Sequence, residues 1–261
     1  PLSERITLTA ADGNLLAAWR ADPVIDDPDS DVKGAIVVLH AVYGLTDHMG
    51  DVVRCLGSGA EFGCALSYKV QETAGGIAHA LALAGSFAAG DKVCVILGDN
   101  IFEYSIAPYV DGFRRQQRGA RVLLKEVGDP ERYGVVAFNE TGRAVSIEEK
   151  PAKPKSNYAV TGLYFYDNRV VEMANNLKPS ARGELEITDI NTRYLEQGDL
   201  HVELLGRGTV WLDTGTHASL LDAGNFVRTL TERQGQQVGS PDEIAFKFVI
   251  IKKVVFEREV F

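Results

Sequence analysis

Cysteine and positive charge are both scarce in this sequence. Only three cysteines, Cys55, Cys64 and Cys94, occur among 261 residues, too few and too irregularly spaced for a disulfide framework or a zinc ribbon. We expect them to be reduced packing residues of a cytoplasmic protein. The 27 Lys and Arg residues stand against 36 Asp and Glu residues, a formal net charge of -9. This balance argues against nucleic acid or an anionic membrane as the partner, although a nucleotide needs only local positive charge.

Long apolar runs and paired histidines are also missing. No apolar run reaches the roughly 18 residues that span a bilayer, and the beginning of the sequence lacks a basic segment followed by an apolar one. We therefore expect neither a membrane anchor nor export. The five histidines show no i, i+4 pairing that would indicate a zinc site.

What is present is the composition of a folded α/β protein. Hydrophobic residues make up 45% and charged residues 24% of the chain, which is typical of globular domains. From residue 56 onward, strand-like and helix-like segments alternate, and this rhythm predicts a mostly parallel sheet covered by helices. Strands are predicted at 15–20, 34–39, 65–70, 92–97, 121–127, 134–138, 144–149, 158–166 and 201–205, and helices at 47–56, 76–88, 106–118, 169–176, 187–197 and 217–234.

The chain divides into three predicted segments, 1–55, 56–245 and 246–261. The first carries nine acidic and four basic side chains, and its predicted strand at 6–9 forms a hairpin with 15–20. The last alternates apolar and charged residues, which is typical of β structure. The two ends differ so much from the middle that the chain reads as a chimera of two α/β fragments.

A candidate metal ligand follows the predicted strand at 92–97. Asp99 lies just past the end of this strand, directly after Gly98. An aspartate in this place is typical of metal ligands in α/β enzymes, and the glycine allows a phosphate to approach closely. Taken alone, the aspartate is more typical of a turn or a helix cap.

Six motifs, in order, resemble those of a known family. They are LGDNIF (97–102), RYGVV (132–136), SIEEKP (146–151), AVTGLY (159–164), ARGELEITD (181–189) and WLDTGT (211–216). Over about residues 56–245, the chain resembles the glucose-1-phosphate thymidylyltransferases. The resemblance implies a Rossmann-like fold of the nucleotide-sugar transferase type and a homo-oligomer. It also implies an enzyme that uses Mg²⁺ and makes dTDP-glucose from dTTP and glucose 1-phosphate.

The resemblance also assigns roles to residues at matching positions. Asp99 and Asp213 match the magnesium ligands, whereas Lys150 and Arg182 match the cations that hold the sugar phosphate. The remaining matches are the base-reading positions Gln71 and Gly76 and the glucose pocket of Tyr133, Gly134, Glu149, Val160 and Tyr164. Hard carboxylates suit Mg²⁺, and arginine can hold phosphate through two parallel hydrogen bonds. The alternatives are surface charges for the two cations and core packing for the two tyrosines.

Two departures from the family pattern bear on activity. Ala74 and Gly75 stand where the family usually has proline and an acidic residue, and we expect this change to loosen the base-reading loop. The family's glycine-rich triphosphate loop, with its arginine and lysine, is absent from residues 1–55. Positioned cations stabilise the departing pyrophosphate in nucleotidyl transfer. A module that binds sugar phosphate without turnover is therefore the alternative to an active enzyme.

A second, shorter resemblance concerns the amino-terminal segment. Residues 5–53 resemble the start of a dienelactone hydrolase, through ADG (11–13), GAIVVLH (34–40) and GLTDH (44–48). The nucleophile elbow of that family, glycine-x-cysteine-x-glycine or its serine equivalent, occurs nowhere in the sequence. An esterase is accordingly the weakest of the three functional alternatives.

Overall fold

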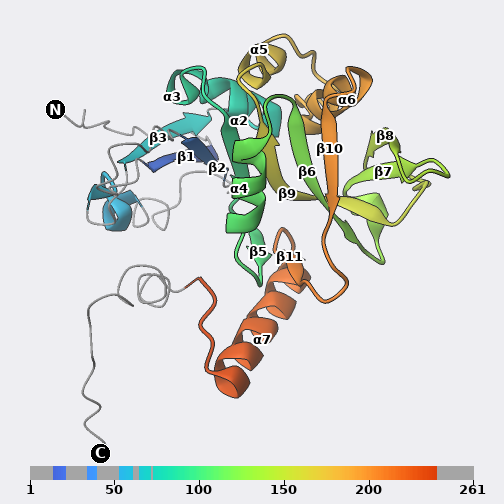
Figure 1. Cartoon of the computed structure of the whole chain (residues 1–261). Helices are drawn as coiled ribbons and strands as arrows, with labels where there is room; N and C mark the ends of the chain where they lie inside the picture. Colours follow the sequence, from blue (N-terminus) through green and yellow to red (C-terminus); the bar gives the residue numbers. More distant parts are fainter. Residues whose placement is uncertain (1–13, 22–33, 40–52, 61–64, 72, 240–261) are drawn as a thin grey trace, which may run out of the picture. The chain divides into compact units, whose positions relative to one another are not determined.

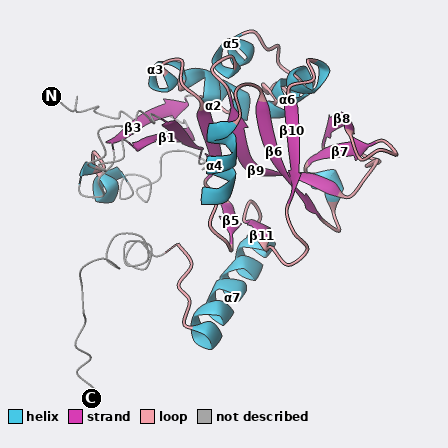
Figure 2. Cartoon of the chain, viewed as in Figure 1, coloured by secondary structure: helices cyan, strands magenta, loops and turns pink. Residues whose placement is uncertain are grey.

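A mixed β-sheet forms the centre of the fold (Figure 1). The computed structural model describes residues 14–21, 34–39, 53–60, 65–71 and 73–239. The chain divides into two units, Pro1–Trp211 and Leu212–Phe261, and the sheet belongs to the first. Figure 2 shows helices packed around these strands.

The elements agree well with the predicted ranges. The strands are β1 (Asn14–Ala21), β2 (Gly34–Leu39), β3 (Ala65–Gln71), β4 (Val93–Leu97), β5 (Asn100–Phe102), β6 (Ala120–Glu126), β7 (Gly134–Phe138), β8 (Ala144–Glu149), β9 (Tyr158–Tyr166), β10 (Leu200–Leu204) and β11 (Trp211–Asp213). The helices are α2 (Ile77–Leu83), α3 (Gly85–Ala88), α4 (Ala107–Arg115), α5 (Val170–Asn175), α6 (Ile187–Glu196) and α7 (His217–Gln234), with a 3-10 turn, η2 (Pro130–Arg132). The predicted strand at 6–9, most of the helix at 47–56 and the tail at 246–261 lie outside the described residues.

The α/β class is confirmed, and most strands of the main path run in one direction, although most neighbouring pairs are antiparallel. The strand order is β10-β6-β9-β4-β2-β1-β3. β1 and β9 run opposite to the other strands of this path, so β2–β4 and β6–β10 are the parallel neighbours among the described strands. The sequence misleads here because β9 is buried on both faces. Such burial removes the alternation that marks an antiparallel strand.

The strand at 34–39 lies in the sheet beside β4, as predicted. The two strands pair in parallel from Ala35 opposite Val93 to Leu39 opposite Leu97. Both strands therefore end at the same edge, and Asp99 follows two residues after Leu97. Ligands of open α/β sheets bind beyond the carboxyl ends of parallel strands, so this edge is the first place to look for a site.

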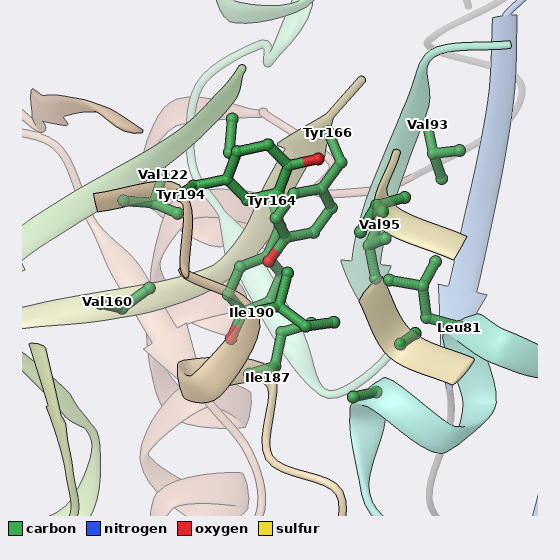
Figure 3. Close-up of a cluster of buried hydrophobic side chains, with 14 of the residues drawn as sticks. Leu81, Val93, Val95, Val122, Val160, Tyr164, Tyr166, Ile187, Ile190 and Tyr194 are labelled. Atoms are coloured by element: carbon green, nitrogen blue, oxygen red, sulfur yellow. The ribbon is translucent and has the colours of Figure 1, made fainter. Parts of the chain in front are cut away.

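Helices cover both faces of the sheet and enclose two hydrophobic clusters. On β9, Tyr164 and Tyr166 join the cluster under α2, α5 and α6, whereas Phe165 joins the cluster under α4. Figure 3 shows the first cluster, in which the rings of Tyr166 and Tyr194 stack with centroids 5.8 Å apart. Neighbouring residues of a strand point to opposite faces, so one central strand anchors both layers.

The predicted helix at 76–88 is broken into α2 and α3. A Cβ on Gly85, the first residue of α3, would lie 2.9 Å from Cγ1 of Val171 on α5. The local pattern of alanine and leucine could not predict this break, because it depends on a close approach between segments that are distant in the sequence. None of the helices in the described part of the chain combines the length and apolarity that a membrane crossing requires.

The cysteine prediction is confirmed for one residue and wrong for another. Cys94 is buried in β4, and burial raises the pKa of its thiol to about 12. Cys55 is exposed, so it does not pack in the core. Cys64 lies outside the described residues.

A buried ionic network closes the end of the sheet remote from Asp99. Asp167 accepts hydrogen bonds from the Gly119 N–H at 2.7 Å, the Tyr194 hydroxyl at 2.7 Å and the Arg169 guanidinium at 2.7 Å. Arg169 also reaches Asp199 at 3.0 Å. Burial alone would raise the pKa of the Asp167 carboxyl, but the bonds from Arg169, Gly119 and Tyr194 outweigh burial and lower that pKa.

Replacing Asp167 with asparagine should destabilise the protein mainly at neutral pH. A carboxyl whose pKa is lowered by folding stabilises the fold above its unfolded pKa of about 3.9, and this contribution disappears as the pH falls through the folded value. We expect the D167N variant to lose about 2 kcal/mol of unfolding free energy at pH 7, and clearly less near pH 2, in urea titrations. Asp129→Asn, which breaks an exposed pair with Arg132, is the control. An equal loss at both pH values would assign the effect to packing instead of charge.

Candidate active site

The first candidate residue lies at the carboxyl end of β4. Asp99 follows Leu97 and Gly98, and its Oδ1 accepts a hydrogen bond of 2.8 Å from Nδ2 of Asn100. The side chain is half-buried.

Three of the predicted glucose-pocket residues are brought together by strand pairing. Gly134 on β7 lies opposite Glu149 on β8. A Cβ built on Gly134 would lie 3.6 Å from Oε2 of Glu149 and 3.7 Å from Cγ2 of Val160 on β9. It would also lie 3.2 Å from Oγ1 of Thr188, which donates a hydrogen bond to Glu149. Because Gly134 has no side chain, a carboxylate, a hydroxyl and an apolar group lie close together around its Cα.

Arg182 lies beside Glu149 and forms ion pairs with neighbouring carboxylates. Its Nε and Nη2 donate to Oε1 of Glu186 at 3.1 and 3.0 Å, and its Nη2 lies 3.1 Å from Glu184 and 3.8 Å from Glu149. Ser180 also donates to Glu186, at 2.7 Å. Burial opposes the charged guanidinium, but the hydrogen bonds and charges of the glutamates outweigh it and raise the pKa of Arg182. Arg182 is therefore a fixed cation in an acidic setting.

Lys150 occupies an unusual backbone conformation at the end of β8. Its φ is +42°, in the left-handed region that side chains other than glycine rarely adopt. Its N–H donates to the carbonyl of Tyr133 at 2.9 Å, and its side chain is exposed. Strained backbone of this kind costs about 1–3 kcal/mol and is common at functional sites.

The loop assigned to base recognition is held by hydrogen bonds. The carbonyl of Gly75 accepts from the N–H of Leu185 at 2.8 Å, and Nε2 of Gln71 donates to the carbonyl of Gly76 at 3.1 Å. Gly76 has φ +87°, and a Cβ there would lie 2.6 Å from the carbonyl oxygen of Leu185. The two glycines permit this close docking, which a bulkier pair of residues would prevent.

The two predicted pocket tyrosines have their rings in hydrophobic clusters. Tyr164 is only 5% exposed and belongs to the core cluster in Figure 3. The ring of Tyr133 packs against Trp211, with centroids 5.2 Å apart, in the cluster on the other face. The alternative of core packing therefore describes both rings, although the Tyr133 carbonyl also anchors Lys150.

Asp213 lies in the second unit, where its Oδ1 accepts a hydrogen bond of 2.8 Å from the N–H of Gly215. Helix α7 then begins at His217, after a capping box between Thr216 and Ser219. Asp213 thus ends β11, four residues before α7 begins.

The described carboxylates suit Mg²⁺ better than zinc. No group of three or more His, Cys, Asp or Glu side chains that could hold a metal ion occurs among the described residues. Mg²⁺ does not need such a cage, because it keeps several waters and binds one or two carboxylates together with phosphate oxygens. Asp99, at a strand end with an amide donor on one oxygen, is a donor of this hard type.

Sequence reasoning missed three polar residues that organise the site. Thr188 and Glu186 lie in the same motif as Arg182, and Asn100 lies next to Asp99. All three residues belong to the recognised motifs. The contacts of their side chains, however, depend on strand pairing and loop docking, which the motifs do not show. The spacing of four residues between Arg182 and Glu186, which suits an ion pair, was the signal available in the sequence.

Comparisons with known proteins agree with this arrangement. A family model described as nucleotidyl transferase matches residues 23–229. The chain is 53% identical over 195 residues to a glucose-1-phosphate thymidylyltransferase of Neisseria meningitidis, covering 74% of this chain and 68% of the relative. It is 52% identical over 192 residues to one of Xanthomonas campestris, covering 73% and 65%. The chain thus spans 65–68% of the length of these curated relatives.

Solved structures give the same result. A crystal structure described as a glucose-1-phosphate thymidylyltransferase from Bacillus anthracis matches with a TM-score of 0.68 and 47% identity, covering 80% of this chain and 79% of that chain. A UDP-glucose pyrophosphorylase matches with a TM-score of 0.60 and 21% identity, covering 74% and 81%, and shares the fold. The family match begins at residue 23 and therefore includes β2. These matches favour the transferase over the non-catalytic and esterase alternatives.

Proposed function

This chain belongs to the nucleotidyl transferase family and, within it, to the glucose-1-phosphate thymidylyltransferases, and we propose that it makes dTDP-glucose from dTTP and glucose 1-phosphate. In this reaction a phosphate oxygen of glucose 1-phosphate forms a bond to the α-phosphorus of dTTP. The bond from that phosphorus to its bridging oxygen breaks, and pyrophosphate leaves. Catalysis of this kind depends on positioning and on charge stabilisation.

The observation that carries the proposal is the grouping of Glu149, Val160 and Arg182 around Gly134. Glu149 can accept hydrogen bonds from two sugar hydroxyls, and Val160 offers an apolar surface to the sugar ring. Arg182, whose Nη2 lies 3.8 Å from Oε1 of Glu149, is near enough to contact a phosphate on the same sugar. A carboxylate for hydroxyls beside a cation for phosphate is the arrangement that a sugar phosphate requires.

The acidic setting of Arg182 bears on how phosphates are accommodated. Arg182 faces Glu149, Glu184 and Glu186, so its single positive charge is more than balanced. Phosphate binding there requires further positive charge, which Lys150 on the neighbouring strand end supplies. Mg²⁺, for which Asp99 is the proposed ligand in the first unit, would supply the rest and neutralise charge on the transferring phosphate.

Base recognition is assigned to the loop of Gln71 and Gly76. The amide nitrogen of Gln71 is committed to the Gly76 carbonyl and to Nδ1 of His79, at 3.1 and 3.0 Å. These bonds fix the Gln71 side chain and thereby the direction of its amide. A pre-set amide costs little entropy when a base binds.

The direct test is product formation by the wild-type chain. With dTTP, glucose 1-phosphate and Mg²⁺, we expect dTDP-glucose and pyrophosphate by liquid chromatography and a coupled phosphate assay. An Asp99→Ala, Asp213→Ala variant sets the background. Product at background level, together with calorimetric binding of glucose 1-phosphate, would contradict turnover and support the non-catalytic module. We further propose a cytoplasmic homo-oligomer, which fractionation and sedimentation would test.

A further inference from the structure

The side chain of Asn100 joins three segments that are far apart in the sequence. Its Oδ1 accepts from the N–H of Gly162 at 2.9 Å and from Nε1 of Trp211 at 2.6 Å. Its Nδ2 donates to Oδ1 of Asp99 at 2.8 Å. The loop after β4, the middle of β9 and the beginning of β11 therefore meet at one amide group.

Chemistry allows only one orientation of this amide. A backbone N–H and an indole N–H are donors only, so both must face the oxygen of Asn100. The nitrogen is then left to face Asp99, whose carboxylate accepts. Two fixed donors on one side thus ensure that Asn100 always presents a donor to Asp99.

Gly162 makes room for this side chain. A Cβ on Gly162 would lie 2.5 Å from Oδ1 and 2.6 Å from Cγ of Asn100, closer than real side-chain contacts. Gly162 lies in the middle of β9, where a glycine costs stability unless something else approaches closely. The Asn100 amide is the group that approaches.

The contacts continue from Asn100 toward the phosphate cations. Trp211 is 9% exposed and packs on the ring of Tyr133, and the Tyr133 carbonyl accepts from the N–H of Lys150. In the sequence, Trp211 also stands two residues before Asp213. The Asn100 amide thus connects Asp99 with Trp211. Through the ring and the carbonyl of Tyr133, these contacts continue to the backbone of Lys150.

We propose that Asn100 is a positioning residue that orients the Asp99 carboxylate for Mg²⁺ and couples this site to Trp211. The proposal rests on the proposed function, because Asp99 binds Mg²⁺ only if the chain works as a nucleotidyltransferase. The donated hydrogen bond occupies one lone pair of Asp99 and fixes the direction of the others. Residues that orient metal ligands typically contribute about 10-fold to 100-fold in metal affinity or activity.

Two variants of Asn100 separate its roles. Asn100→Leu is similar in size but can neither donate nor accept, and we expect the Kd for Mn²⁺ in the presence of dTTP, measured by EPR, to rise about 10-fold to 100-fold. Asn100→Asp keeps both accepted bonds, so it tests the donor even if the leucine variant folds poorly. Because a second carboxylate then faces Asp99, turnover should fall by about 10-fold or more, while the melting temperature stays at its wild-type value.

The coupling between the Asp99 site and Trp211 can be measured separately, by NMR. Adding Mg²⁺ with dTTP to the wild-type chain should shift the indole ¹⁵N–H resonance of Trp211 and leave that of Trp19, the other tryptophan, in place. Asn100→Leu should abolish this shift. Asn139→Asp is the matched control, because Oδ1 of Asn139 also accepts two backbone N–H bonds, in an exposed turn.

Three results would overturn the proposal: Mn²⁺ binding by Asn100→Leu as tight as wild type, wild-type turnover by Asn100→Asp, or a Trp211 resonance in the wild-type chain that ignores Mg²⁺. These failures appear while the wild-type chain still forms dTDP-glucose. A wild-type chain that neither binds Mn²⁺ nor forms product would contradict the proposed function itself, and this proposal with it.

Discussion

Replacing Asp99 with asparagine is expected to lower turnover about 100-fold to 1,000-fold while leaving the fold intact. Asparagine has the same shape, and its Oδ1 can still accept the hydrogen bond from Nδ2 of Asn100. What is lost is the negative charge that we propose binds Mg²⁺ next to the transferring phosphate. We expect kcat to fall and the half-saturating Mg²⁺ concentration to rise in steady-state assays, with an unchanged melting temperature.

The matched control for this variant is Asp111→Asn. Asp111 lies on the exposed face of α4, where it pairs with Arg114 at 3.5 Å, and it has no part in the site. The same chemical change there should leave kcat and the Mg²⁺ dependence as in the wild type. Wild-type kinetics in Asp99→Asn would contradict the assignment of Asp99 as a metal ligand.

Replacing Gly134 with alanine is expected to raise the KM for glucose 1-phosphate about 10-fold to 100-fold. The new methyl group would lie 3.2 Å from Oγ1 of Thr188 and 3.6 Å from Oε2 of Glu149, the carboxylate assigned to the sugar hydroxyls. One methyl group in a substrate pocket is worth about 1–3 kcal/mol. The backbone of Gly134 does not require glycine, so the free energy of unfolding should change little.

Gly128→Ala provides the control, because no atom lies within 4 Å of a Cβ at that exposed turn. For Gly134→Ala, initial rates should show a raised KM for the sugar phosphate and an unchanged KM for dTTP. An equal rise for both substrates, or a large fall in melting temperature, would show that the methyl group disturbs the fold instead of the sugar pocket.

Local signals in the sequence correctly predicted the helices and strands whose ends carry typical capping or turn residues. The β7–β8 hairpin and α7 begin and end at the predicted residues. The hairpin turn is built around Asn139, whose side chain accepts bonds from the residues that follow, and α7 has a capping box and a final glycine, Gly235. These signals act over three or four residues, and therefore the sequence alone reveals them.

Properties that depend on distant segments were not predictable in the same way. The direction of β9 is set by its neighbours β4 and β6, and the break between α2 and α3 by Val171 on α5. The candidate site shows the same difference between local signals and contacts made by folding. Glu149 and Val160 could be proposed from motifs, whereas the bonds that hold Arg182 and Asp99 depend on side chains brought close by folding.

The docking of Gly75 and Gly76 against Leu185 has a consequence for protein engineering. The loop assigned to the base and the segment that carries Arg182 share backbone hydrogen bonds, and the loop has no space for added side chains. Grafting a base-reading loop from a relative of different nucleotide preference would therefore misplace the phosphate-binding segment as well. Residues 71–76 and 180–188 have to be exchanged as one block if specificity is to change without loss of activity.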